Sequence, residues 1–283
     1  MSTAAVSVIM PSFNRLEWLR AAIDSVFAQT HRQWELIVID DGSGAPTRDY
    51  LRALAETGDD RVKVMFGAHC GNPPLARNVA LRAARGEYVA FLDSDDLWVP
   101  AKLERQLASL RARPGREWSY TGAVLVDAGG KPLAGRSLPS PAVRDGWIGE
   151  SLLRGEAAVT QSSILVERAA LERVGGYPED LPVCGDYELF VRLALRSEVD
   201  FVAEDLVLIR RHGEHYSSDI QALTDLYRFI RKLQCSGLAP HMAAILRARR
   251  LSVARSLARA VAVSITPGWV KGLVRGSVMR HSA

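Results

Sequence analysis

The chain has 283 residues, of which 48% are hydrophobic and 24% are charged, which is enough apolar content for the core of one large domain or two merged halves. Its cysteines, Cys70, Cys184 and Cys235, are odd in number and far apart, which argues against a zinc site or a disulfide framework and favours a reducing, cytoplasmic location. No uncharged apolar stretch approaches the roughly 20 residues that a membrane-spanning helix needs, and no basic leader precedes the first predicted strand.

Charge is distributed unevenly along the chain. All 32 acidic residues and 25 of the 36 basic residues lie within residues 1–225, so this part has a net charge of 25 − 32 = −7. The remaining 58 residues contain 11 Lys or Arg and no acidic residue. The high sequence pI of about 9.1 is therefore due to the basic tail. The net negative charge of residues 1–225 gives no reason to expect a nucleic-acid partner.

Strands and helices are predicted to alternate over the first region, residues 1–112. Short apolar runs predict strands, and apolar residues at helical spacing predict helices. Asn14 and Glu17 are predicted to cap the first helix. Strand–helix–strand units join parallel strands, so the pattern predicts an α/β fold with a mostly parallel sheet flanked by helices. The predicted strands are 6–10, 34–39, 62–66 and 88–92, and the predicted helices are 15–29, 47–57, 74–85 and 100–113.

Polar segments follow three of these strands. Ligands of open parallel sheets bind beyond the carboxyl ends of the strands, so we expect the three segments to line one crevice. Crowded carboxylates repel one another, and a hard cation such as Mg2+ or Mn2+ removes that repulsion. We therefore predict a metal-assisted phosphate site, with a helix N-cap at Asp95 or Asp96 as the alternative interpretation. The segments are Pro11-Ser12-Phe13-Asn14, Asp40-Asp41-Gly42-Ser43 and Asp93-Ser94-Asp95-Asp96.

The second region, residues 113–225, has a less regular pattern. A Gly- and Pro-rich excursion over 128–150 predicts a loop or a hairpin. Trp98, just before this region, is either a wall for a stacked sugar or a core residue. Cys184 is expected to be a buried small side chain. The predicted strands are 120–126, 160–166 and 205–210, the predicted helix is 186–196, and a turn is expected at 175–178.

The tail, residues 226–283, is predicted to be helical and basic. A weak apolar stripe marks a helix over 241–263, and a second helix beyond Pro267 carries Trp269 on one side and Lys271 and Arg275 on the opposite side. An Arg-rich helix that carries a Trp is typical of a segment lying on a membrane surface. A helix that packs on the body and exposes a basic face is the alternative.

Taken together, these motifs resemble family 2 glycosyltransferases of the GT-A fold over about residues 5–215. The resemblance implies a Rossmann-like sheet, a nucleotide-sugar donor (commonly a UDP-sugar), Mn2+ or Mg2+, and transfer to an acceptor hydroxyl with inversion. It implies a donor-binding first half and an acceptor-binding, catalytic second half. The motifs run from Val8 to Asn14, Asp40 to Ser43, Ala76 to Asn78, Gly86 to Asp96, Gly175 to Tyr177 and Asp186 to Leu189.

The resemblance also implies a role for individual residues. Asp186 matches the catalytic base, and Asp93 and Asp95 match the metal-binding pair. His212 is either a third metal ligand or phosphate contact, or a plain loop histidine. The residues implied near the nucleotide or the donor are Pro11, Ser12, Phe13, Asn14, Asp40, Asp41, Arg77, Asp93 and Ser94.

One position departs from the family pattern. Gly185 stands before Asp186, where the family often has a second acidic residue. Glu179 and Asp180 are the alternative candidates for the base. The Gln-x-x-Arg-Trp signature of processive synthases is absent from the sequence, which favours transfer of one sugar or a few.

Three other functions compete with this interpretation. A sugar nucleotidyltransferase would have a Gly-rich, basic turn after the first strand, and a dinucleotide dehydrogenase would have G-x-G-x-x-G there. This sequence has Pro11-Ser12-Phe13-Asn14 at that place, which disfavours both functions. A nucleotide-sugar-binding protein without turnover, held at a membrane by its tail, is the non-enzymatic alternative. The expected acceptor is a saccharide or a lipid-linked saccharide in cell-surface polysaccharide synthesis, at the inner face of the plasma membrane.

Overall fold

The computed structural model describes residues 5–138, 145–212, 219–235 and 240–265. The chain forms two compact units, residues 1–214 and 215–283. The expected boundary between body and tail, after residue 225, therefore falls inside helix α8 (Asp219–Gln234).

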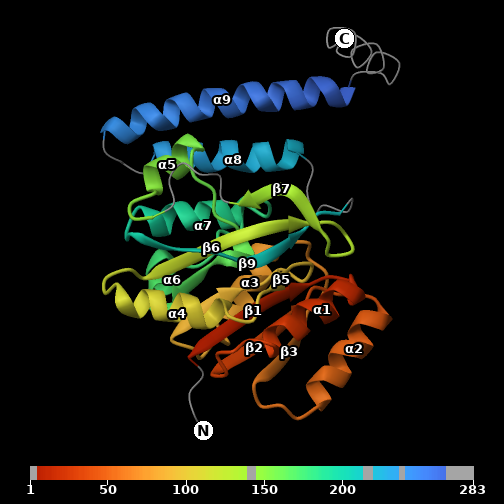
Figure 1. Ribbon diagram of the computed structural model, residues 1–283. Coiled ribbons are helices and arrows are strands. Elements are labelled where there is room, and N and C mark those ends of the chain that lie inside the picture. Colours follow the sequence, from red (N-terminus) through yellow and green to blue (C-terminus); the bar gives the residue numbers. More distant parts are fainter. Residues whose placement is uncertain (1–4, 139–144, 213–218, 236–239, 266–283) are drawn as a thin grey trace. The chain divides into compact units, whose positions relative to one another are not determined.

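The first half of the larger unit alternates as predicted (Figure 1). Strand β5 is too short to give a periodic signal, and α3 ends four residues earlier than expected. The elements are β1 (Val6–Ser12), α1 (Leu16–Phe27), β2 (Trp34–Asp40), α2 (Ala45–Glu56), β3 (Val62–Phe66), α3 (Pro73–Leu81), β4 (Tyr88–Phe91), β5 (Leu97–Trp98) and α4 (Lys102–Ala112).

The second half confirms the predicted hairpin, because β7 pairs antiparallel with β6. The expected strand 160–166 is mostly wrong. A 3-10 turn replaces its start, where Ser163 Oγ donates to the Thr160 carbonyl, and only a short strand follows. The elements are β6 (Trp118–Val126), β7 (Pro132–Leu138), α5 (Gly149–Arg154), η1 (Gln161–Ser163), β8 (Leu165–Glu167), α6 (Arg168–Val174), α7 (Gly185–Ala194) and β9 (Val199–Arg210).

One sheet joins the strands in the order β3-β2-β1-β4-β8-β6-β9-β5, and β7 pairs with β6 at the side. Strands β1 to β4 are parallel, as predicted, whereas β4–β8, β8–β6 and β9–β5 are antiparallel. Ser12 pairs with Asp40, and Ile9 pairs with Phe91. The carboxyl ends of β1, β2 and β4 therefore lie at the same edge of the sheet.

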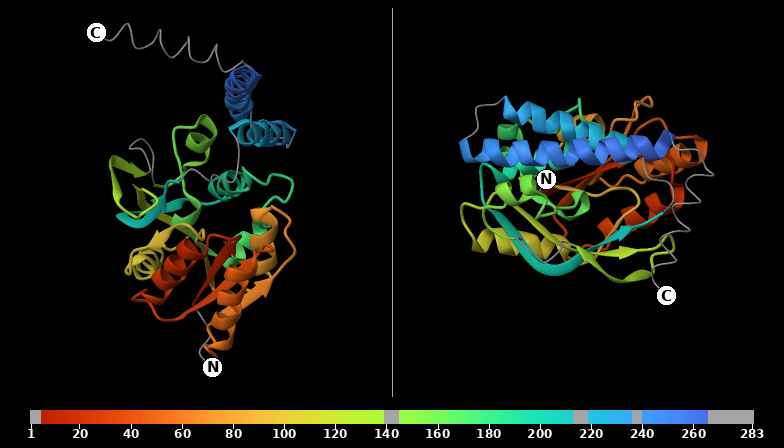
Figure 2. Two further views of the ribbon diagram at one scale, coloured as in Figure 1. Left: turned by 90° about the vertical axis from the view of Figure 1, so that its right-hand side faces the viewer. Right: turned by 90° about the horizontal axis from the view of Figure 1, so that it is seen from above.

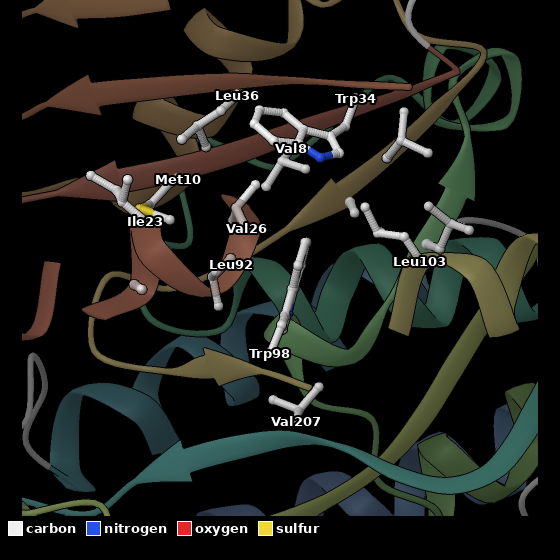
Figure 3. Close-up of a cluster of buried hydrophobic side chains, with 14 of the residues drawn as sticks. Val8, Met10, Ile23, Val26, Trp34, Leu36, Leu92, Trp98, Leu103 and Val207 are labelled. Atoms are coloured by element: carbon white, nitrogen blue, oxygen red, sulfur yellow. The ribbon is translucent and has the colours of Figure 1, made fainter. Parts of the chain in front are cut away.

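Helices lie on both faces of this sheet (Figure 2). Val8, Met10 and Leu36 belong to one buried cluster with residues of α1 and α4 (Figure 3). Leu51 of α2 belongs to the same cluster. Side chains alternate along a strand, so the intervening residues face the other side, where α3 packs against β1 and β2. Trp98 is a core residue, 4% exposed, and its Nε1 donates to the Ser162 carbonyl at 2.8 Å, which overturns the sugar-wall interpretation.

The smaller unit contains α8 and α9 (Pro240–Ile265), which lie side by side (Figure 2). Helix α9 confirms the prediction for 241–263, and Met242, Leu246 and Val253 of its expected apolar stripe are buried. The predicted second helix with Trp269 lies outside the described residues. Within the described part of the chain, no helix combines the length and the hydropathy needed to cross a membrane.

Candidate functional site

The polar segments after β1 and β2 are tied together by hydrogen bonds. Asn14 N donates to Ser43 Oγ at 2.7 Å, and Gly44 N donates to Asn14 Oδ1 at 2.9 Å. The predicted cap of Asn14 on α1 is therefore wrong, because the amide oxygen of Asn14 serves the neighbouring turn instead. Both Asn14 (φ 55°) and Arg15 (φ 60°) adopt the left-handed conformation, which is uncommon for residues with a side chain. This backbone path leads from β1 into α1, which starts at Leu16.

Asp40 is completely buried beneath the second segment. Its carboxylate accepts from Ser43 N at 3.2 Å and from Arg48 Nε at 3.0 Å, so it holds the turn that carries Asp41. Ser12 is also buried, and its Oγ has no hydrogen-bond partner among the described residues. These two predicted donor-binding residues are thus buried, and Pro11, next to Ser12, is half-buried.

Asp41 and Phe13 meet the loop between β3 and α3, which the sequence did not single out. Asp41 accepts from Cys70 N at 2.8 Å and from Gly71 N at 2.9 Å, and its Oδ2 lies 3.1 Å from His69 Nδ1. Burial pushes the pKa of Asp41 upward, but these hydrogen bonds and the nearby imidazole hold it below its usual range. Phe13, 41% exposed, stacks on His69 with ring centroids 4.0 Å apart. The result is an ionised carboxylate beside exposed aromatic rings.

Arg77 lies in α3, only 7% exposed, and points toward the end of β4. Its Nη2 donates to Asp93 Oδ1 at 2.5 Å, and its guanidinium lies 5.5 Å from the centre of the Tyr177 ring. Arg77 Nε is buried and has no hydrogen-bond partner among the described residues. A buried, charged N–H without a partner is costly, which makes this atom a candidate contact for an anionic ligand.

Asp186 lies in the first turn of α7, next to this arginine. Cys184, which is half-buried, is the N-cap residue, so Asp186 is not the cap, and its Oδ1 accepts from Tyr187 N at 2.7 Å. Burial raises the pKa of Asp186; the Arg77 charge opposes this rise, and the Asp93 charge adds to it. A carboxylate with a raised pKa is suited to accepting a proton near neutrality.

The departure at Gly185 has a packing reason. A Cβ at this position would lie 2.7 Å from Pro74 Cγ, so α7 approaches the first turn of α3 more closely than a side chain allows. An acidic residue at 185 therefore does not fit this arrangement. Asp186 is the acidic residue of this motif that lies near the charge of Arg77.

The turn before α7 is held by Asn78, which flanks Arg77 in α3. Asn78 Nδ2 donates to the Tyr177 carbonyl and to Glu179 Oε1, both at 2.9 Å, and Asn78 Oδ1 accepts from Tyr177 N at 2.9 Å. Glu179, an alternative candidate for the base, is thus engaged in holding this turn.

Asp95 is surrounded by cationic and aromatic side chains. His212 Nε2 lies 3.0 Å from Asp95 Oδ2, and Arg15 Nη1 donates to the same oxygen. Arg210 Nε donates to the Asp95 carbonyl at 2.9 Å. The Trp18 ring lies 4.4 Å from the His212 ring, so the structure places His212 beside Asp95 rather than in an unconnected loop.

The other residues of the acidic segment are mostly buried. Asp96 accepts from Ser162 Oγ at 2.6 Å and from Arg210 N at 3.0 Å, and burial together with the Asp93 and Asp95 charges raises its pKa well above the usual value. Ser94 is 7% exposed. The alternative of a helix capped by Asp95 or Asp96 is wrong, because β5 follows the segment and α4 starts at Lys102.

The donor set partly fits a divalent cation. No group of three His, Cys, Asp or Glu side chains converges on one point within the described residues. Asp93 pairs with Arg77, while Asp95 and His212 supply an adjacent carboxylate oxygen and imidazole nitrogen. Both ligand types suit Mn2+, and phosphate oxygens of a bound nucleotide complete such sites in other enzymes.

Part of the sequence matches a known protein family and individual relatives. The model of glycosyl transferase family 2 matches residues 7–115. Two relatives are each 43% identical to this chain. One, over 128 residues, is TuaG of Bacillus subtilis (strain 168), named as a teichuronic acid biosynthesis glycosyltransferase; the other, over 110 residues, is the Escherichia coli UDP-Glc:alpha-D-GlcNAc-diphosphoundecaprenol beta-1,3-glucosyltransferase WfgD. Within residues 7–115, this chain is similar to glycosyl transferase family 2.

The matches to these relatives cover 45% and 39% of this chain and 50% and 42% of the relatives, so the chain spans half or less of their length. Solved structures support the GT-A fold over more of it. S. aureus TarS 1-349 in complex with UDP-GlcNAc has a TM-score of 0.70 at 21% identity, covering 89% of this chain and 72% of TarS 1-349. The Pyrobaculum calidifontis mannosyltransferase PcManGT, in complex with GDP-Man and Mn2+, has a TM-score of 0.67 at 21% identity, with 98% and 81% covered.

Proposed function

We propose that this protein is an inverting glycosyltransferase of family 2 that moves a sugar from a nucleotide donor, a UDP-sugar, to a hydroxyl group of a saccharide or a lipid-linked saccharide. One observation carries the proposal: Asp41, Arg77 and Asp95 gather at one edge of the sheet, and Asp186 lies beside Arg77. The ligand of TarS and the donor and acceptor in the name of WfgD support this substrate class.

The donor is held along this edge in three parts. Phe13 and His69 offer exposed rings for the base, and Asp41, which stays ionised, accepts a hydrogen bond from it. The unpartnered Nε of Arg77 binds the diphosphate. Asp95 and His212 hold Mn2+ or Mg2+, and Asp93 orients Arg77. When bound, the metal neutralises the charge that develops on the leaving diphosphate.

Asp186 takes the proton of the acceptor hydroxyl as the new bond forms. The oxygen of a neutral hydroxyl is a weak nucleophile, so general-base assistance is worth about 10²–10⁴-fold in rate. Burial keeps the pKa of Asp186 above that of an ordinary aspartate, while Arg77 keeps its carboxylate available. A base on one face of the sugar and the diphosphate on the other produce a single displacement with inversion.

The proposal is tested by turnover of UDP-sugars with a panel of saccharide and lipid-linked acceptors, with and without chelator. We expect release of UDP that depends on the acceptor, requires Mn2+ or Mg2+ and forms a product of inverted configuration. Donor binding without any turnover in the presence of metal would favour a binding protein, and release of pyrophosphate would favour a nucleotidyltransferase.

The basic tail gives this proposal a membrane component. Arg247, Arg255 and Arg259 are exposed on α9, and Leu251, which lies four residues from two of them, is 55% exposed. The spacing places Arg247, Leu251 and Arg255 along one side of the helix. We propose that this side of α9 attracts an anionic membrane surface, where a lipid-linked acceptor is found.

Changing these three arginines to glutamine should weaken binding to anionic phospholipid vesicles on the order of 10²-fold, because each basic residue near such a surface contributes about 1 kcal/mol. The measurement is vesicle co-sedimentation at fixed salt. The matched control changes the exposed Arg52 and Arg105 of the larger unit, which should leave binding unchanged. If the α9 variant binds the vesicles as well as the control variant does, the basic face of α9 has another role.

A further inference from the structure

The carboxylate of Asp95, the proposed metal ligand, already forms an ion pair with a cationic side chain. Arg15 Nη1 and His212 Nε2 both reach its Oδ2 atom. The Arg15 side chain is 24% exposed and that of Asp95 is 17% exposed, so this ion pair is largely shielded from water. A divalent cation that binds Oδ2 therefore meets the guanidinium group at the same atom.

The position of Arg15 is built into the fold. Arg15 follows Asn14, both residues are left-handed, and Asn14 is held from the β2 side by Ser43 and Gly44. The Arg15 guanidinium also lies 5.8 Å from the Trp18 ring, the same ring that contacts His212. Backbone and aromatic contacts thus direct Arg15 to Asp95.

The Arg15 guanidinium and a divalent cation repel each other at one carboxylate oxygen. Only one of them is required at a time to balance the negative charge of the acidic segment. Without ligand, Arg15 offsets the repulsion among Asp93, Asp95 and Asp96, which lie within four residues. When a metal ion takes over that task, the guanidinium is displaced. A diphosphate is the nearest anion to receive it, because bidentate phosphate binding suits arginine.

We propose that Arg15 is a positioning residue that occupies Asp95 until a divalent cation arrives, and then moves to the donor diphosphate. This proposal rests on the metal-assisted donor site described under the proposed function. It makes metal binding and nucleotide binding mutually dependent: Arg15 weakens metal binding in the empty site and strengthens nucleotide binding in the metal-loaded site.

Mn2+ affinity, measured by the electron paramagnetic resonance signal of free Mn2+, tests the proposal without any turnover. In the absence of nucleotide, Arg15→Gln should tighten Mn2+ binding about tenfold, which corresponds to about 1.4 kcal/mol. With saturating Mn2+, the same variant should bind UDP more weakly than the wild type does. Arg15→Lys keeps the charge and should retain most of the competition with Mn2+.

Three further measurements make the result decisive. Arg20→Gln, a matched change on the exposed side of α1, should leave Mn2+ affinity unchanged. Asp95→Asn should lose Mn2+ binding, and thermal melting should show that each variant is folded. Unchanged or weaker Mn2+ binding by Arg15→Gln would overturn the Arg15 proposal alone. Absence of Mn2+ binding by the wild type, even with UDP, would also overturn the metal site of the proposed function.

Discussion

Asp95→Ala is expected to lower transfer on the order of 10³-fold or more, because it removes the carboxylate that positions the metal against the donor diphosphate. The variant should stay folded. It loses the ion pair with Arg15 but also relieves repulsion with Asp96, whose pKa is raised by burial and by the charges of Asp93 and Asp95. Initial rates at saturating UDP-sugar and Mn2+, together with thermal melting, measure both effects.

The matched control for this prediction is Asp49→Ala. Asp49 lies on α2, its side chain is 67% exposed, and its carboxylate pairs with the exposed Arg52. Its removal should leave the rate within about twofold, since exposed ion pairs contribute little. Wild-type rates for Asp95→Ala would show that Asp95 has no part in the reaction.

Asp186→Asn should retain donor binding and lose transfer by about 10²–10⁴-fold, because the amide cannot take the proton of the acceptor hydroxyl. The amide oxygen can still accept from Tyr187 N, so the start of α7 should be preserved. The prediction separates binding from chemistry. The Kd of UDP should change little, while kcat falls.

Glu179→Gln is the comparison that tests the assignment of the base. Glu179 accepts from Asn78 Nδ2, and a glutamine oxygen can replace that acceptor, so the variant should remain active. If Glu179→Gln loses transfer while Asp186→Asn keeps it, the base has been assigned to the wrong carboxylate.

The arrangement of the first half was predictable because its signals are local. Apolar runs and helical spacing indicated alternating strands and helices, and the rules for parallel sheets placed the three polar strand ends together. Pairing of Ser12 with Asp40 and of Ile9 with Phe91 confirms this geometry. Parallel pairing did not extend to β8, which follows the turn at η1 and pairs antiparallel with β4.

The remaining parts of the site depend on contacts between residues far apart in the sequence. The loop residues around Cys70 bind Asp41, and Arg15 binds Asp95, 80 positions away. No periodicity or spacing encodes such pairs. The burial of Asp40 could not be predicted from the sequence either. Asp40 and Asp41 are adjacent residues of the same type and differ only in the side of the turn that they face.

The most direct test of the central claim is the location of nucleotide and metal in a crystal of this protein grown with a UDP-sugar and Mn2+. Anomalous scattering identifies the Mn2+ ion without assumptions about the site. We predict Mn2+ on Asp95 and His212, the diphosphate beside Arg77 and the uracil beside Asp41. A nucleotide bound away from Asp41 and Arg77, or Mn2+ bound without Asp95, would contradict the account.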